Sequence, residues 1–150
     1  MTQTFPSTAW FRALAERMAA QPQKYRNLGS MDLTLLPRIV FPDGHAELYG
    51  LAFEGHRCRS VDRLPDVGAV RTRHPVVIEG EYAAWREMIE NIRANAGPDL
   101  THSLNYLTFP DYPMRVTGPD QLEVDAFYRY NQSLQRFFNG AAVVPTVYAA

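Results

Sequence analysis

The chain has 150 residues, of which 46% are apolar and 21% are charged, and its formal net charge at pH 7 is -1. This composition excludes a disordered chain, which combines low hydrophobicity with high net charge. It also argues against a dedicated nucleic-acid-binding protein, because phosphate binding requires a concentrated positive surface. We predict one domain over residues 1–150, with a core at about residues 7–140 and an apolar carboxy-terminal tail at 141–150.

Cysteine content and hydropathy bear on the cellular location. Cys58 is the only cysteine, which rules out an internal disulfide and a zinc site built from several cysteines. No apolar run approaches the ~20 residues needed to cross a bilayer. Residues 1–6 lack the basic and apolar regions of a secretory signal. We therefore expect a cytoplasmic protein with no integral membrane segment.

The first predicted element is a helix. Ser7 or Thr8 can accept hydrogen bonds from the free amides of its first turn. Apolar residues follow at helical spacing, namely Trp10, Phe11, Leu14 and Met18. Gln21-Pro22 is expected to end this helix.

A strand is predicted from Met31, since apolar Leu33 and Leu35 follow at every second position. Pro37 lacks a backbone N–H and is therefore expected at a bulge or at a sheet edge. The sequence Phe-Pro-Asp-Gly-His at 41–45 is typical of a tight turn.

The turn at 41–45 leads to a returning strand at 46–54. Gly55-His56 then predicts a reversal into a third strand at 57–61, and residues 62–68 are expected to form a loop. Consecutive strands joined by tight turns are antiparallel, so this part of the chain predicts a β-meander.

The second half alternates strands and helices. A buried strand is predicted at 75–78, and the apolar residues Tyr82, Trp85, Ile89 and Ile92 lie on one face of a following helix that Gly97-Pro98 ends. One short helix is expected at 99–107 and a strand at 114–117.

A long final helix is predicted from its cap at Asp120, with one stripe formed by Val124, Phe127, Asn131, Leu134 and Phe138. Strands separated by helices need a crossover connection. The chain therefore predicts an α+β fold: a single mixed sheet of about five strands with helices covering one face.

Motifs for catalysis or cofactor binding are missing from the sequence. The four histidines are dispersed without metal-ligand spacing, and no nucleophile elbow or glycine-rich phosphate loop occurs. His56 and Cys58 are interpreted as a turn histidine and a packed cysteine. We predict no catalytic residue, no metal and no cofactor.

Arginines are concentrated between residues 57 and 73. The cluster consists of Arg57, Arg59, Arg63, Arg71 and Arg73. It either forms a basic rim that attracts a carboxylate, a phosphate or an acyl-coenzyme A, or it is a solvated strand face, which is the more common case.

Aromatic residues are abundant in the two long predicted helices. Core packing is their default role. A single sheet with few helices, however, offers a small core for so many rings, and apolar space left between them suits an apolar ligand.

From Val76 onward the chain resembles the sterol carrier protein 2-like family. The residues that carry the resemblance are the strand Val76-Val77-Ile78 running into an acid-flanked helix with Trp85, the helical stretch 100–107, the strand 114–118 and the turn at Asp120. The hairpin around residues 42–44 extends the similarity to about residues 7–140.

The resemblance implies a helix-covered sheet over a hydrophobic tunnel for sterols, fatty acids or acyl-coenzyme A. Family members bind and transfer lipids. This chain differs from the family pattern at Asp111-Tyr112-Pro113, where Gly-Lys is frequent, and in a longer, more aromatic final helix. These differences point to another ligand or to a helix that fills the tunnel itself.

The leading hypothesis is therefore a protein that binds, and transfers, an apolar small molecule: a sterol, fatty acid, acyl-coenzyme A or aromatic metabolite. Two walls are expected, one from the final helix and one from the helix before it. The predicted ligand-binding residues are Trp85, Ile89, Tyr106, Phe127, Tyr130, Leu134 and Phe138.

Two alternatives stay open. One is a small isomerase, cyclase or hydrolase that uses the same cavity, with His102, Tyr106, Asp111 and Tyr112 as its polar groups. The other is an interaction subunit, for instance of a homodimer. In that case the tail 141–150 covers the tunnel mouth, pairs with an edge strand of a second copy, or frays.

Overall fold

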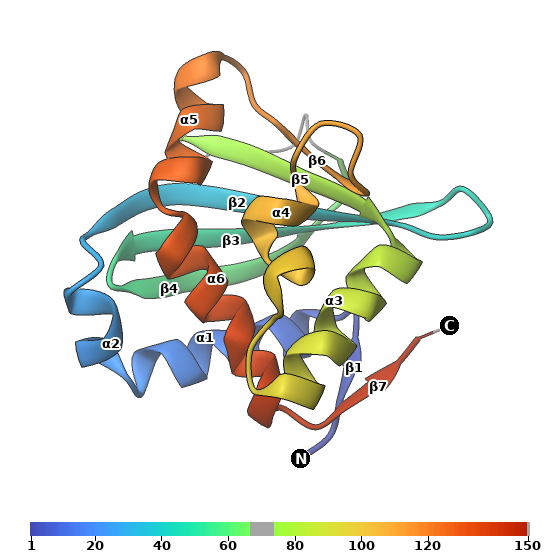
Figure 1. The fold of residues 1–150 in the computed structure, drawn as a ribbon, viewed down its shortest axis with the longest axis horizontal. Helices are drawn as coiled ribbons and strands as arrows, with labels where there is room; N and C mark the ends of the chain where they lie inside the picture. Colours follow the sequence, from blue (N-terminus) through green and yellow to red (C-terminus); the bar gives the residue numbers. More distant parts are fainter. Residues whose placement is uncertain (67–73, 150) are drawn as a thin grey trace.

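The computed structural model describes residues 1–66 and 74–149, and it has the α+β architecture predicted from the sequence (Figure 1). A five-stranded mixed sheet has the order β4-β3-β2-β5-β6. Its strands are β2 (Met31–Val40), β3 (Ala46–Gly55), β4 (Arg57–Leu64), β5 (Pro75–Glu81) and β6 (Met114–Thr117). β2 runs parallel to β5 and the other neighbours are antiparallel.

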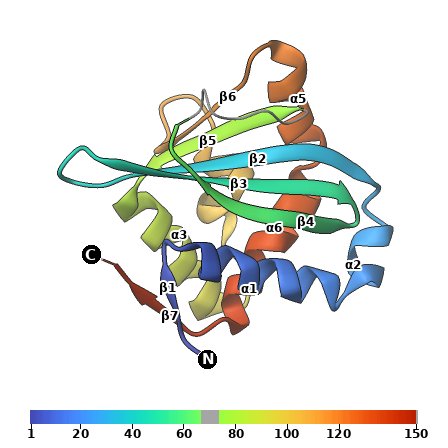
Figure 2. The same ribbon diagram turned by 180° about the vertical axis from the view of Figure 1, so that it is seen from behind.

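The helices lie mostly on one face of this sheet. They are α1 (Thr8–Ala19), α2 (Pro22–Arg26), α3 (Tyr82–Asn95), η2 (Leu100–His102), α4 (Leu104–Leu107), α5 (Gln121–Arg129), α6 (Asn131–Asn139) and η3 (Gly140–Val143). α3, α4 and α6 lie in front of the sheet in Figure 1 and behind it in the reverse view of Figure 2, which confirms the predicted one-sided cover.

The amino-terminal helix is capped as predicted. The Ser7 hydroxyl accepts a hydrogen bond from the Trp10 amide at 3.0 Å, which satisfies one free donor of the first turn of α1. The apolar stripe of α1 is fully buried. The helix contacts β4 and α6, so it closes one side of the core.

The β-meander is confirmed, but the predicted place of Pro37 is wrong. Pro37 lies inside the central strand β2, beside Ile78 of β5. On the β3 side, Leu35 pairs with Leu51 and Arg38 pairs with Leu48, so the register is the same before and after the proline. The missing N–H thus interrupts pairing locally without a bulge, and the observed bulge lies between β3 and β4.

Two loop and helix boundaries also differ from the prediction. β4 extends to Leu64 into the expected loop, while residues 67 and 68 lie outside the described part of the chain. The helix expected at 99–107 is two short helices, because Ser103 adopts an extended backbone and its hydroxyl accepts a hydrogen bond from the Tyr106 amide, which starts α4 anew.

The long helix expected from Asp120 is also two helices. It breaks at Tyr130 (φ -96°, ψ 13°), where α5 ends and α6 begins. The break lets the two halves meet different partners: α5 contacts β5 and β6, and α6 contacts α1 and α4. Phe127, Leu134 and Phe138 of the predicted stripe nevertheless all face the core.

The carboxy-terminal tail folds onto its own chain. β7 (Thr146–Tyr148) runs parallel to β1 (Gln3–Phe5), and the Trp10 indole N–H donates to Thr146 Oγ1 at 3.1 Å. Arg93 of α3 donates to the carbonyl oxygens of Ala141 and Val144. The tail is therefore ordered by contacts with both the first and the third helix.

Candidate ligand-binding site

Five of the seven predicted ligand-binding residues lie in the closed core between sheet and helices. Trp85, Ile89, Phe127, Leu134 and Phe138 are 0% exposed. The rings of Trp85 and Phe138, one from each predicted wall, have centroids 6.1 Å apart. None of the five lines a cavity described below, and their contact with a ligand stays a prediction.

The other two predicted residues are half-buried and lie apart from each other. Tyr130 borders a hollow of about 360 Å³ alongside α5. In this hollow His74 Nδ1 lies 3.0 Å from Glu123 Oε1. Tyr106 instead joins an aromatic cluster on the loop between α4 and β6, with ring centroids 5.4 Å from Phe109 and 4.8 Å from Tyr112.

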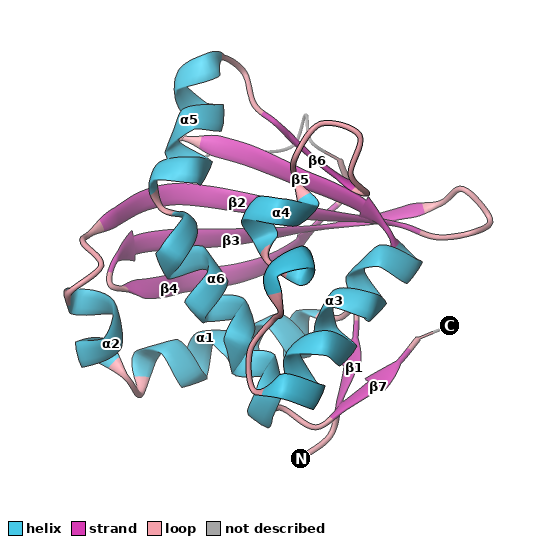
Figure 3. Ribbon diagram, in the orientation of Figure 1, coloured by secondary structure: helices cyan, strands magenta, loops and turns pink. Residues whose placement is uncertain are grey.

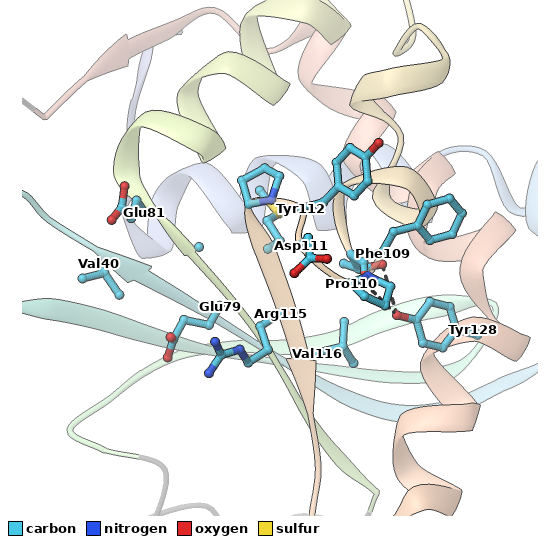
Figure 4. Close-up of a pocket in the computed structure, with 14 residues that line it drawn as sticks. Val40, Glu79, Glu81, Phe109, Pro110, Asp111, Tyr112, Arg115, Val116 and Tyr128 are labelled. Atoms are coloured by element: carbon cyan, nitrogen blue, oxygen red, sulfur yellow. Dashed lines mark hydrogen bonds between the residues drawn. The ribbon is translucent and has the colours of Figure 1, made fainter.

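The loop at residues 108–113, one of the pink segments of Figure 3, forms one wall of a larger cavity of about 510 Å³ (Figure 4). The opposite wall comes from the carboxyl ends of β2 and β5 and from the edge strand β6, and Tyr128 of α5 completes the rim. The lining residues are Val40, Glu79, Gly80, Glu81, Thr108, Phe109, Pro110, Asp111, Tyr112, Pro113, Met114, Arg115, Val116 and Tyr128.

Local hydrogen bonds hold the loop in this shape. Thr108 Oγ1 donates to the Leu104 carbonyl at 2.8 Å, and Tyr128 Oη donates to Thr108 Oγ1 at 3.2 Å. Asp111 has a left-handed backbone (φ 71°), a conformation that aspartate and asparagine tolerate better than most side chains. This turn presents the side chains of residues 109–112 to the cavity and to solvent.

Exposed aromatic rings gather at this cavity. Phe109 is 40%, Tyr112 44% and Tyr128 38% exposed, and all three line it. Within residues 1–66 and 74–149 no other aromatic side chain counts among the exposed large hydrophobic groups. Because exposed apolar surface costs free energy in water, such a concentration is typical of a binding surface.

Carboxylates outnumber cations along the cavity wall. Glu79 forms an ion pair with Arg38 at 2.6 Å. For Glu81 and Asp111 no salt-bridge partner lies within 4.0 Å among the described residues. Figure 4 shows Arg115 on the same side of the cavity as Glu79, and Asp111 on the loop beside Tyr112.

A pair of phenol groups stands at the rim. Tyr112 Oη donates to Tyr106 Oη at 3.2 Å, and this hydrogen bond raises the pKa of Tyr112. The Tyr112 ring is therefore a neutral phenol at physiological pH, with an electron-rich face.

The polar residues of the enzyme alternative are only partly brought together. Asp111 and Tyr112 line the cavity, and Tyr106 contacts Tyr112. His102 is not among the lining residues. Its two ring nitrogens lie 2.7 Å from Asp99 Oδ1 and 3.0 Å from Glu87 Oε2, so carboxylates engage both of them.

The sequence pattern did not identify most of the cavity. Glu79 and Glu81, the acidic residues that flank the predicted helix, both line the cavity, and Glu81 makes no side-chain hydrogen bond as the N-cap of α3. Phe109, Arg115 and Tyr128 carried no local signal. The departure from the family pattern at residues 111–113 does coincide with the cavity wall.

Two of the three described arginines of the cluster form ion pairs on the strand face. Arg59 lies 2.7 Å from Glu54, and Arg63 lies 3.6 Å from Glu47. Arg71 and Arg73 lie outside the described residues. Within the described ranges, moreover, no group of three or more His, Cys, Asp and Glu side chains is arranged to hold a metal ion.

Comparisons with known proteins bear on the fold. No protein-family model and no curated protein matches the chain. A crystal structure of sterol carrier protein 2 superposes with a TM-score of 0.61 at 18% identity, covering 92% of this chain and 97% of the other. A solution structure of a conserved hypothetical protein from Thermus thermophilus, named as a candidate sterol carrier protein, gives 0.59 at 18% identity, with coverages of 93% and 90%.

The chain thus has the sterol carrier protein 2 fold, and the predicted resemblance is confirmed at the level of architecture. None of the described helices has the length and hydropathy that a bilayer-spanning segment requires.

Proposed function

We propose that this protein binds and transfers an apolar small molecule of the sterol or fatty-acid class, and that the cavity beside the loop 108–113 is where the ligand first binds. The observation that carries the proposal is the gathering of the exposed aromatic rings at this one cavity. The fold supports it, since one similar structure is named sterol carrier protein 2.

The size of the cavity suits such a ligand. Its volume of about 510 Å³ falls within the ~300–1,000 Å³ range of small-molecule sites. Covering the exposed parts of Phe109, Tyr112 and Tyr128 removes apolar surface from water, at ~25 cal/mol per Å².

The inner walls predicted from the sequence remain part of this proposal. A ligand that reaches them must separate Phe138 from Trp85, because these rings are in contact and fully buried. The outer cavity would then serve as the entrance, and displacement of α6 would admit a longer apolar chain. Homodimer formation and a cytoplasmic location stay predictions.

A fluorescent fatty acid and a fluorescent sterol test the proposal by titration with the folded protein. We expect saturable binding at micromolar probe, weakened about tenfold by the double variant Phe109→Ala/Tyr112→Ala, because a tenfold loss corresponds to ~1.4 kcal/mol of lost contact.

Leu122→Ala is the matched control, since Leu122 is an exposed apolar residue (76%) that does not line this cavity. It should bind both probes like the unaltered protein. If neither probe binds saturably to folded protein, the proposed function is wrong.

A further inference from the structure

The charges of the cavity indicate which head group its ligand carries. Resting on the function proposed above, we propose that the cavity beside the loop 108–113 selects amphiphiles with a cationic head group, an alkylamine or a quaternary ammonium, over those with a carboxylate.

The aromatic rim is the first reason. The Tyr106, Phe109 and Tyr112 rings lie within 4.8–6.2 Å of one another, and Tyr112 and Phe109 line the cavity. Ring faces attract a cation that sits within ~6 Å of the ring centre, most strongly where water is excluded. The Tyr112 phenol stays neutral, so its hydroxyl places no negative charge there and its ring face is kept.

The unbalanced carboxylates are an independent reason. Glu81 and Asp111 both line the cavity, Glu81 on the wall formed by the end of β5 and Asp111 on the loop wall (Figure 4). Neither has an ion-pair partner among the described residues, as noted above. A cation between these walls gains attraction from both, and a carboxylate there would be repelled by both.

Arg115 is the positively charged residue of the lining, and its charge favours an anionic head group over a cationic one. Figure 4 shows its guanidinium group extending toward Glu79, on the side of the cavity away from Phe109 and Tyr128. Arg38 forms an ion pair with Glu79 at 2.6 Å. Arg115 has no salt-bridge partner within 4.0 Å among the described residues, so it offsets part of the charge of Glu81 and Asp111. The aromatic side, with Asp111, is left for the cationic head group.

Apolar side chains provide a path for the tail. Val40, Met114 and Val116 line the same cavity, and Met114 is buried at 3% exposure. An alkyl chain can therefore lie along β6 while its head group stays at the rim, so that each part of the amphiphile contacts groups of matching polarity.

Calorimetric titration with three ligands of one chain length tests the inference: decyltrimethylammonium, decanoate and decyl maltoside, each below its micelle concentration. We expect decyltrimethylammonium to bind at least about tenfold more tightly than decanoate. Added salt should reduce this preference, since screening weakens the attraction of partly exposed charges.

Glu81→Gln and Asp111→Asn should each lower affinity for decyltrimethylammonium about threefold to tenfold while leaving decyl maltoside unchanged. Asparagine tolerates the left-handed backbone at position 111, so this variant should keep the loop. Arg115→Gln should strengthen decyltrimethylammonium binding. Glu16→Gln, an exposed change on α1, is the control and should alter nothing.

Equal or tighter binding of decanoate would overturn the selectivity while leaving the proposed function intact. So would a Glu81→Gln protein that keeps the full preference for the ammonium ligand. If none of the three ligands binds while the fluorescent fatty acid or sterol does, the head-group selectivity is wrong and the proposed function stands; if those probes fail as well, the proposed function itself fails.

Discussion

The core and the outer cavity are built from the same kinds of side chain, yet they differ in nearly every physical property. In the core, Trp85, Phe127 and Phe138 are 0% exposed and packed between sheet and helices. At the cavity, Phe109 and Tyr112 are 40% and 44% exposed. The comparison teaches that position within the layers, and not residue type, decides whether a ring stabilises the fold or remains available to a ligand.

The reason for the difference is the position of β6. Within the described residues it is an edge strand of the sheet and pairs with β5 alone. The loop 108–113 leads into this edge (Figure 1), away from the centre of the sheet that α3 and α6 cover. Rings in the centre are covered by α3 and α6, whereas rings at the edge have one packed side and one solvent side.

The largest expected effect separates the two regions directly. Phe138→Ala should lower the free energy of unfolding by about 3–5 kcal/mol, because it removes a fully buried ring and leaves a cavity. Phe109→Ala should lower it by about 0.5 kcal/mol or less, as for most surface substitutions. Urea denaturation measures both, and equal losses would mean that the loop rings belong to the core.

An intermediate loss of stability is expected when the contacts between α3 and the carboxy-terminal tail are removed. Arg93 donates to the Ala141 and Val144 carbonyl groups, so Arg93→Met should cost about 2 kcal/mol, as for the loss of partly buried charged hydrogen bonds. Tail residues should also become more sensitive to carboxypeptidase.

The control for the tail is Arg26→Met, at an exposed arginine at the end of α2. It should leave stability unchanged. Ligand binding at the outer cavity should also survive Arg93→Met. Loss of binding in this variant would show that the two regions are coupled.

The smallest effect concerns the ion pairs that His102 forms with Asp99 and Glu87. Hydrogen bonding to Asp99, with a smaller contribution from Glu87, raises the pKa of His102 above its usual value of 6.5. A raised folded pKa stabilises the protein fully below the unfolded pKa, and this contribution is lost as pH rises through the folded value. His102→Asn should therefore be less stable than the unaltered protein below about pH 6.

The difference in free energy of unfolding between the unaltered protein and His102→Asn should decrease as pH rises toward 8. At every pH it should stay within the ~0.2–1 kcal/mol typical of exposed ion pairs. Urea denaturation across this range measures it. Titration of Asp99 does not contribute to this pH dependence, because its pKa, lowered to about 2 mainly by the hydrogen bond with His102, lies far below the pH range measured. A stability difference that does not change with pH would contradict a raised pKa of His102 in the folded protein.

Much of the fold could be predicted because its signals are local. The Ser7 cap, the turn at 41–45 and the stripe through Trp85 and Ile92 each lie within a few residues, and the structure shows all of them. The break at Tyr130 could not be predicted, because it depends on α5 and α6 meeting different partners.

The candidate site was harder to predict than the fold. His102, Tyr106, Asp111 and Tyr112 were grouped at one end of the expected tunnel, and of these Tyr106 and Tyr112 are hydrogen-bonded to each other. Glu81 and Tyr128 come from elements distant in sequence. Neither local spacing nor composition reports that such elements share one cavity, because this depends on how the edge strand is placed.

By itself, the sequence determined the order of most strands and helices, the apolar faces they bury and the one-sided α+β layering, since hydrophobic periodicity and turn chemistry act over short stretches. Only the tertiary structure decided that β1 and β7, from opposite ends of the chain, lie side by side. It also decided which aromatic rings are covered. Burial depends on neighbours that folding brings together from distant positions, and no window of sequence contains them.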